Sequence, residues 1–158
     1  MKPITFIKGD ATCPEAKGTK FICHICNGIG GWGKGFVLAI SKRWEEPEAV
    51  YRAWYANRKS NNFSLGAVQF VQVEPWIWIA NLVAQRGVKK GSNGPPIRYD
   101  ALRECLAKVA EKATERTASI HMPRMGCGLA GGKWELIEPI IVETLCTRGL
   151  SVTVYDFE

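Results

Sequence analysis

Two glycine-rich segments contain most of the residues that could bind a ligand. The first covers residues 27–35 and reads NGIGGWGKG, and the second covers residues 126–132 and reads GCGLAGG. They hold five and four of the chain's 16 glycines. Each follows an expected strand and precedes an expected helix, where free backbone N–H groups and the helix dipole favour a phosphate group. The pair therefore predicts a clamp for a diphosphate.

Simple tight turns are the alternative reading of each glycine segment, because a single glycine motif is weak evidence for a ligand. Neither segment reads G-x-x-x-x-G-K-[ST], and the first is not a clean G-x-G-x-x-G followed by a ribose-binding acid. A nucleotide triphosphatase and an ordinary dehydrogenase are therefore disfavoured.

His24 is the titratable side chain beside the first segment whose ordinary pKa is near neutral. There it could position a water molecule or protonate a leaving group. A buried histidine hydrogen-bonded to the backbone is the alternative.

Cys23 and Cys26 have C-x-x-C spacing, but alternation along a strand directs them to opposite faces. The chain has only two histidines and no second close-set cysteine pair, so no metal site is predicted. No cofactor is expected either.

The length of 158 residues fits one domain that spans residues 1–158. A net charge of +6 favours anionic partners, but Lys and Arg are scattered and no nucleic-acid-binding motif occurs, so nucleic acid is disfavoured. No leader pattern and no apolar stretch of about 18 residues occurs, which predicts a cytoplasmic protein without a membrane partner. The six cysteines are expected to be thiols there.

Hydrophobic periodicity predicts alternating strands and helices. The runs 67–73 and 76–84 are joined by two residues, too few for a crossover helix, and should form an antiparallel pair. The pattern predicts an α/β fold, a three-layer α/β/α sandwich with a central mixed sheet. The other strands are expected over residues 4–8, 20–26, 119–122 and 151–155, and helices near Phe36, Pro47, Tyr99 and Trp134, the last ending at Gly149.

Four pieces of sequence, in order from Lys8 to Phe157, resemble the macrodomain (Appr-1''-p processing) family: KGDAT, HICNGIGGWGKG, HMPRMGCGLAGGKW and VTVYDF. The resemblance is to the branch that contains an ADP-ribose-1''-phosphate phosphatase and a terminal ADP-ribose protein glycohydrolase. It implies a macrodomain-like fold that binds ADP-ribose or a derivative.

At the adenine end, the resemblance implies that Asp10, with Ala11 beside it, accepts a hydrogen bond from the adenine amino group. An ordinary turn-capping role is the alternative for Asp10. The resemblance also implies that Tyr155 or Phe157 stacks on the adenine ring, and the sequence leaves that choice open.

The resemblance further implies that the first segment runs beside the distal ribose and that the second binds the diphosphate. Asn27 matches an asparagine that reaches the distal ribose, with turn capping as its alternative, and His24 matches a histidine of the phosphatase. These two are the expected catalytic residues. The expected ligand-binding residues of the segments are Gly30, Gly31, Trp32, Gly33, Lys34, Gly35, Gly126, Cys127, Gly128 and Leu129.

Three functions of such a site stay open: phosphate release from ADP-ribose-1''-phosphate, removal of ADP-ribose from an ADP-ribosylated protein, and binding without turnover. The glycohydrolase of this branch uses a lysine and an acid, and this chain has Gln85 and Ala130 at the matching positions, although Lys89 and Lys90 follow closely. This departure disfavours the second function. The oligomeric state is left open.

Overall fold

Strands and helices alternate along the chain in the computed structural model, which describes residues 1–87, 96–128 and 130–157. The predicted elements are present, most within one or two residues of their expected bounds. In chain order they are β1 (Thr5–Lys8), β2 (Lys20–Asn27), α1 (Phe36–Arg43), α2 (Glu46–Ala56), the 3-10 helix η1 (Arg58–Ser60), β3 (Val68–Glu74), β4 (Ile77–Gln85), α3 (Tyr99–Arg116), β5 (Ser119–Pro123), α4 (Trp134–Thr144), the 3-10 helix η2 (Cys146–Arg148) and β6 (Val152–Asp156).

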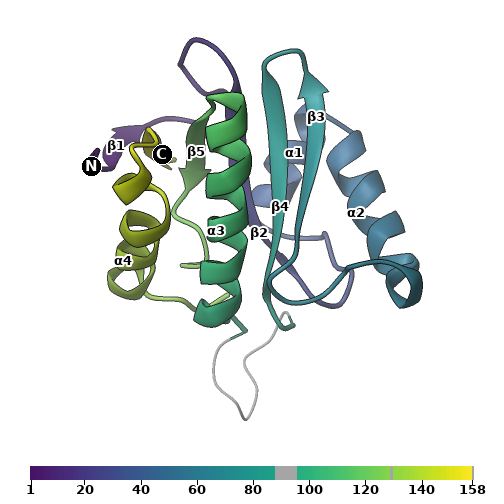
Figure 1. The fold of residues 1–158 in the computed structure, drawn as a ribbon. Coiled ribbons are helices and arrows are strands. Elements are labelled where there is room, and N and C mark those ends of the chain that lie inside the picture. Colours follow the sequence, from purple (N-terminus) through teal and green to yellow (C-terminus); the bar gives the residue numbers. More distant parts are fainter. Residues whose placement is uncertain (88–95, 129, 158) are drawn as a thin grey trace.

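The six strands form one mixed sheet in the order β1-β6-β5-β2-β4-β3. Strand β3 pairs antiparallel with β4, as the short connection between them predicted, and the other neighbours pair parallel. Helices α3 and α4 lie on the near side of the sheet in Figure 1, and α1 lies on the far side. The predicted three-layer α/β/α sandwich is therefore confirmed.

Strand β2 separates the two hydrophobic cores. Phe21 and Cys23 belong to the larger core, under α3 and α4, while Ile22 and Cys26 belong to the core under α1 and α2. Seven of the eight β2 residues are buried, since the strand is covered on both faces. The thiols of Cys23 and Cys26 accordingly point to opposite sides of the sheet, as strand alternation predicted.

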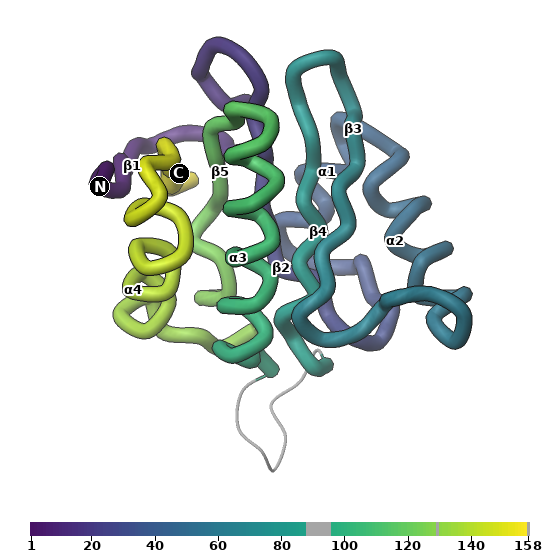
Figure 2. The backbone as a smooth tube through the Cα atoms, in the orientation of Figure 1, coloured from purple at the N-terminus to yellow at the C-terminus, as the bar shows by residue number. Residues whose placement is uncertain are grey.

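Parallel pairing brings the carboxyl ends of β2, β4 and β5 to one edge of the sheet. The connections that follow β2 and β5 both leave from this edge, toward the lower half of the view in Figure 2. These connections contain the two glycine segments. Ligands of open α/β sheets bind outside such carboxyl ends, so the fold gives the segments a suitable place.

One predicted boundary is wrong. Helix α4 ends at Thr144, before the expected Gly149, and a separate 3-10 turn follows it. Gly149 ends that turn in the left-handed conformation, with φ 78°. The expected loop before α3, residues 91–96, lies outside the described residues except for its last position. None of the described helices combines the length and apolar content needed to cross a bilayer.

Thr117 ends α3 in the left-handed conformation, with φ 51° and ψ 47°, which is unfavourable for a β-branched residue. Glycine adopts this conformation without steric cost and is the usual residue after a helix end. We expect Thr117→Gly to raise the free energy of unfolding by about 1 kcal/mol and the melting temperature by roughly 2–4 °C. Thermal and urea denaturation measure both.

Thr117→Ala is the matched control for this prediction. It also removes the hydroxyl and the branch, but it keeps the Cβ atom that is strained at positive φ. Alanine should therefore gain much less stability than glycine. Equal stabilisation by both residues would show that strain at φ is not the cause.

Candidate ligand-binding site

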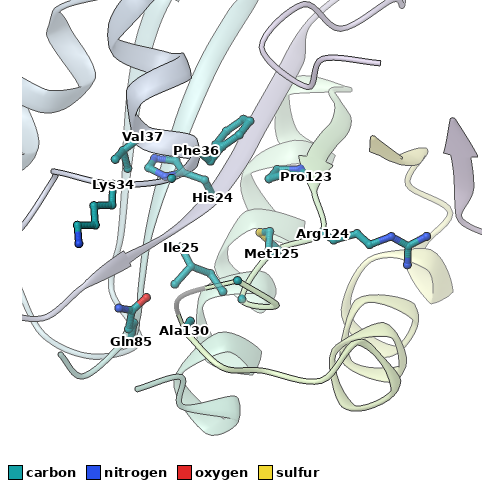
Figure 3. Close-up of a pocket in the computed structure, with 13 residues that line it drawn as sticks. His24, Ile25, Lys34, Phe36, Val37, Gln85, Pro123, Arg124, Met125 and Ala130 are labelled. Atoms are coloured by element: carbon teal, nitrogen blue, oxygen red, sulfur yellow. The ribbon is translucent and has the colours of Figure 1, made fainter. Parts of the chain in front are cut away.

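A cavity of about 240 Å³ lies where the carboxyl ends of β2, β4 and β5 meet the start of α1 and the second glycine segment. Small-molecule sites usually span about 300–1,000 Å³, so this cavity fits part of a dinucleotide-sized ligand. The pocket is drawn in Figure 3. Its lining residues are His24, Ile25, Lys34, Gly35, Phe36, Val37, Gln85, Pro123, Arg124, Met125, Gly126, Gly128 and Ala130.

Helix α1 begins at the cavity wall. Its N-cap residue is Gly35, with φ 80°, and no side chain caps the first turn or places an acid in it. The first-turn N–H groups of a helix have no partner within the helix and carry its positive dipole end. Lys34 adds a cationic side chain at the same wall. This wall of the cavity suits an anionic group.

The glycines of the first segment serve two purposes. A Cβ atom on Gly30 would lie 2.4 Å from the Tyr55 ring, and one on Gly31 would lie 2.9 Å from Asn27 Nδ2, so packing within the protein requires both glycines. A Cβ atom on Gly33 or Gly35 would meet no protein atom within 4 Å. Gly33 also has no positive φ, so neither backbone conformation nor packing explains it.

The glycines of the second segment fall into the same two groups, those required by packing and those with open space around them. A Cβ atom on Gly126 would lie 2.5 Å from the Ile97 side chain, and one on Gly132 would lie 2.6 Å from the Gly126 carbonyl oxygen. Gly128 lines the cavity, has no positive φ and has open space where its Cβ would be. Close approach of a ligand would explain a glycine at such a position.

The Asn27 amide organises the first segment from inside. Its Oδ1 accepts hydrogen bonds from the N–H groups of Ile29 (3.0 Å) and Gly31 (2.9 Å), and its Nδ2 donates to the Gly31 carbonyl at 3.0 Å. The turn-capping alternative for Asn27 is therefore what the structure contains. One hydrogen of Nδ2 takes no part in these three bonds.

His24 forms part of the cavity wall, although only 2% of its surface is exposed. Its Nε2 donates to Asn81 Oδ1 at 2.5 Å, and its ring packs edge-on against Trp32. Burial lowers the pKa of His24 to about 4, although the bond to Asn81 opposes the shift. The expected near-neutral pKa is therefore wrong, since an imidazole without solvent contact disfavours its charged form.

Trp32 does not point toward the cavity. The residue is 3% exposed, and its side chain belongs to the core under α1 and α2 and donates a hydrogen bond from Nε1 to Ser41 Oγ at 2.8 Å. Its place between two glycines suggested a ligand contact, but the apolar ring is better stabilised in the core. The 3% exposure is that of the whole residue, so little of Trp32 is accessible for the expected ligand contact.

Asp10 lies outside the cavity wall and caps a turn. Its Oδ1 accepts hydrogen bonds from the N–H and hydroxyl of Thr12, and its Oδ2 lies 3.6 Å from the Arg43 guanidinium. Partial burial raises the pKa of Asp10, but the bonds from Thr12 and the nearby Arg43 outweigh it, so the carboxyl has a lowered pKa. Asp10 is ionised at neutral pH and can accept a hydrogen bond from an amino group. Ala11 next to it is buried.

The structure separates the two aromatic candidates for stacking. Tyr155 is 4% exposed, and its hydroxyl is hydrogen-bonded to His121 Nδ1 at 2.8 Å. Phe157 is 80% exposed. Only Phe157 therefore offers a free ring face to a planar ligand.

The remaining expected positions lie on or near the cavity. Gln85 and Ala130 both line it, and the Gln85 amide donates to the Gly87 carbonyl. Cys127 is partly buried, with Sγ 3.7 Å from the Met125 carbonyl oxygen. Leu129, together with Lys89 and Lys90, lies outside the described residues.

Sequence reasoning missed most of the apolar wall of the cavity: Ile25, Phe36, Val37, Pro123 and Met125. It also missed Arg124, which stands inside the quoted piece HMPRMGCGLAGGKW. In Figure 3 the Arg124 guanidinium is directed away from the cavity. It pairs with both carboxylate oxygens of Asp156 and lies over the rings of Phe6 and Trp134. The signal that could have identified Arg124 is its position just after the expected strand 119–122.

Nothing in the described ranges gathers three or more His, Cys, Asp or Glu side chains around a space for a metal ion. The cavity wall itself contains no carboxylate among its described residues. Its ionisable lining side chains are His24, Lys34 and Arg124. The geometry is that of a neutral-to-basic site with much exposed backbone, which suits phosphate and ribose groups.

No protein-family model matches the chain. A solved structure of a macrodomain protein from Streptomyces coelicolor is 55% identical to it, with a TM-score of 0.88, over 97% of this chain and 98% of that one. A protein of unknown function from Bacteroides thetaiotaomicron is 60% identical, with a TM-score of 0.93, over 97% of both chains.

Curated relatives are more distant. The Chromodomain-helicase-DNA-binding protein 1-like of Danio rerio is 30% identical over 98% of this chain, but the chain spans only 16% of that relative's length. The ADP-ribose 1''-phosphate phosphatase of Candida albicans is 28% identical over 89% of this chain and 92% of the relative. The ADP-ribose glycohydrolase OARD1 of Bos taurus is 26% identical over 96% and 90%. Since the match to the Streptomyces macrodomain is close and extends over nearly the full length of both chains, this chain belongs to the macrodomain family.

Proposed function

We propose that this macrodomain binds ADP-ribose or a derivative in the cavity and hydrolyses it, with ADP-ribose-1''-phosphate as substrate. The observation that carries the proposal is the open glycine backbone on two sides of the cavity, at Gly35 and Gly128. Backbone N–H groups bind phosphate well where no Cβ atom blocks their approach.

The ligand in this proposal extends beyond the cavity. The diphosphate lies against the segment around Gly128, and the distal ribose lies along the first segment toward Lys34. The adenine lies outside the cavity, where Asp10 offers an ionised carboxylate and Phe157 an exposed ring. The small cavity volume agrees with a ligand of which only the ribose phosphate part is enclosed.

Phosphate release is preferred to removal of protein-linked ADP-ribose because of two lining residues. Gln85 has an amide that forms no Schiff base, and Ala130 has no group that accepts a proton. Lys34 and the start of α1 suit a terminal phosphate. A phosphatase and a glycohydrolase among the relatives support hydrolysis in general.

The pKa of His24 restricts its role in the proposed reaction. With a pKa of about 4 the ring is neutral at pH 7, so it cannot serve as a general acid there. The bond from Nε2 to Asn81 leaves Nδ1 as the unprotonated nitrogen. In this proposal His24 is a positioning residue: its neutral ring is 2% exposed, packs against Trp32 and has Cys26 Sγ 4.0 Å from Nδ1. Asn27 orients the distal ribose.

Binding without turnover is the second candidate function. The described cavity wall contains no carboxylate, and its one imidazole is a weak base, so the site is poorly supplied with groups for proton transfer. An ADP-ribosylated protein would then be the partner. Failure to release phosphate from ADP-ribose-1''-phosphate, together with tight ADP-ribose binding, would decide for this alternative.

Titration calorimetry with ADP-ribose should show one site per chain. Gly128→Glu should weaken binding at least a hundredfold, because a side chain and a negative charge would occupy the diphosphate position. A Cβ atom on Gly128 meets no protein atom within 4 Å, so the variant should melt within a few degrees of the wild type.

Leu136→Glu is the matched control for that variant. Leu136 is 49% exposed on α4 and does not line the cavity, and the substitution changes the net charge equally. Its affinity for ADP-ribose should stay within about twofold of the wild type. A folded Gly128→Glu variant with normal affinity would show that the second segment is only a turn.

The product assay uses ADP-ribose-1''-phosphate and an ADP-ribosylated protein side by side. We expect inorganic phosphate from the first substrate and a much slower reaction with the second. Borohydride should trap no adduct, because Gln85 replaces the lysine that such a reaction needs. A trapped adduct on any lysine would contradict the assignment of the substrate.

The pH dependence of phosphate release tests the state of His24. Its folded pKa lies below its ordinary value, so the ring stays neutral from neutral pH down to about pH 4. The rate should show no inflection near pH 6.5 and should fall only as pH approaches about 4. A wild-type inflection near pH 6.5 that disappears in His24→Gln would show that the imidazole titrates in its ordinary range.

A further inference from the structure

Helix α2 contacts the first glycine segment along one face. The hydroxyl of Tyr51 lies 2.6 Å from the Asn27 carbonyl oxygen and 3.0 Å from its Oδ1. Tyr51 has no exposed surface, and burial raises its pKa, so the hydroxyl keeps its proton and donates. Tyr51 is thus bound to the residue whose amide shapes the segment.

Asn27 transmits this contact to the backbone of the segment. Its Oδ1 accepts hydrogen bonds from the N–H groups of Ile29 and Gly31, and its Nδ2 donates one to the Gly31 carbonyl. The side chain can form these three bonds together only at one position and orientation. The Tyr51 hydroxyl, which contacts both oxygens of Asn27, fixes that position.

Further contacts of α2 secure the segment. The Tyr55 ring, one turn after Tyr51, occupies the space beside Gly30, and Arg52 donates to the Gly30 carbonyl at 3.2 Å. Glu48 accepts a hydrogen bond from Ser41 of α1, whose hydroxyl accepts one from Trp32 of the segment. Among these contacts of α2, the Tyr51 hydroxyl is the one that forms a buried hydrogen bond to Asn27.

We infer that Tyr51 is a positioning residue that sets the affinity for the part of the ligand along the first segment, which, on the proposed function, is the distal ribose of ADP-ribose. Without the hydroxyl, the Asn27 carbonyl loses a buried donor and its amide loses a fixed position. The segment then samples other conformations. Ribose binding must select the one that the hydroxyl had fixed, which lowers the affinity for the ribose. The second segment has no contact with Tyr51 among the described hydrogen bonds, so diphosphate binding is not affected.

Tyr51→Phe tests this inference, with Tyr55→Phe as its matched control. Both substitutions remove a hydroxyl from the same helix beside the same segment, but none of the hydrogen bonds between described residues involves the Tyr55 hydroxyl. The probes are ADP-ribose and ADP, which lacks the distal ribose. We expect Tyr51→Phe to weaken ADP-ribose about tenfold and ADP less than twofold, and Tyr55→Phe to change neither by more than twofold.

Hydrogen exchange of the ligand-free chain provides a readout that does not depend on the ligand. The amide protons of Ile29 and Gly31 should exchange at least fivefold faster in Tyr51→Phe and at the wild-type rate in Tyr55→Phe. Equal weakening of both probes by Tyr51→Phe would mean a general structural role and would overturn the inference. Unchanged exchange at Ile29 and Gly31 would overturn it as well.

The two readouts also separate the inference from the proposed function. A wild-type chain that binds neither nucleotide would contradict the proposed function, and with it the claim about ribose affinity. Exchange at Ile29 and Gly31 would still decide whether Tyr51 holds Asn27 in place. Tyr51→Phe should fold, because phenylalanine keeps the aromatic ring in the core.

Discussion

The double burial of strand β2 is the constraint on which the rest of the structure depends. Seven of its eight residues are buried, because helices cover the strand on both faces. Its neighbours β4 and β5 run parallel to it. Parallel strands end at one edge, which places Ile25, Gln85 and Pro123 in the wall of one cavity. The cavity is a consequence of how the core is built.

The glycines of the two segments fall into two groups, which differ in what surrounds the position of a Cβ atom. Gly30 and Gly126 are glycines because Tyr55 and Ile97 occupy the space of a Cβ atom, so they let the segments pack closely on the core. Gly33 and Gly128 have no such neighbour, so they leave backbone open to the outside. Close packing fixes the segments, and the open glycines leave parts of this fixed backbone uncovered by protein side chains.

Buried polar side chains give this site its geometry while titrating little. Asn81, fully buried, accepts a hydrogen bond from His24 and donates one to Gln69 Oε1 at 3.0 Å. On the same side of the sheet, where Asn81 also donates to the Pro47 carbonyl of α2, Tyr51 donates a hydrogen bond to Asn27. Each of these groups is neutral at pH 7, which is how hydrogen-bonding groups are buried at low cost. A site built this way relies on positioning more than on charge.

The sequence by itself determined the element order, the mixed sheet, the faces of Cys23 and Cys26, and the two glycine segments, because these follow from local periodicity and from the length of connections. The pKa of His24, the direction of Trp32 and the availability of Phe157 over Tyr155 were decided by the tertiary structure alone. Each depends on burial, and burial comes from which elements pack together, which no local pattern contains. For the same reason the sequence indicated only a helical position for Tyr51. Its hydrogen bond to Asn27 joins residues 24 positions apart and forms only when α2 packs beside β2.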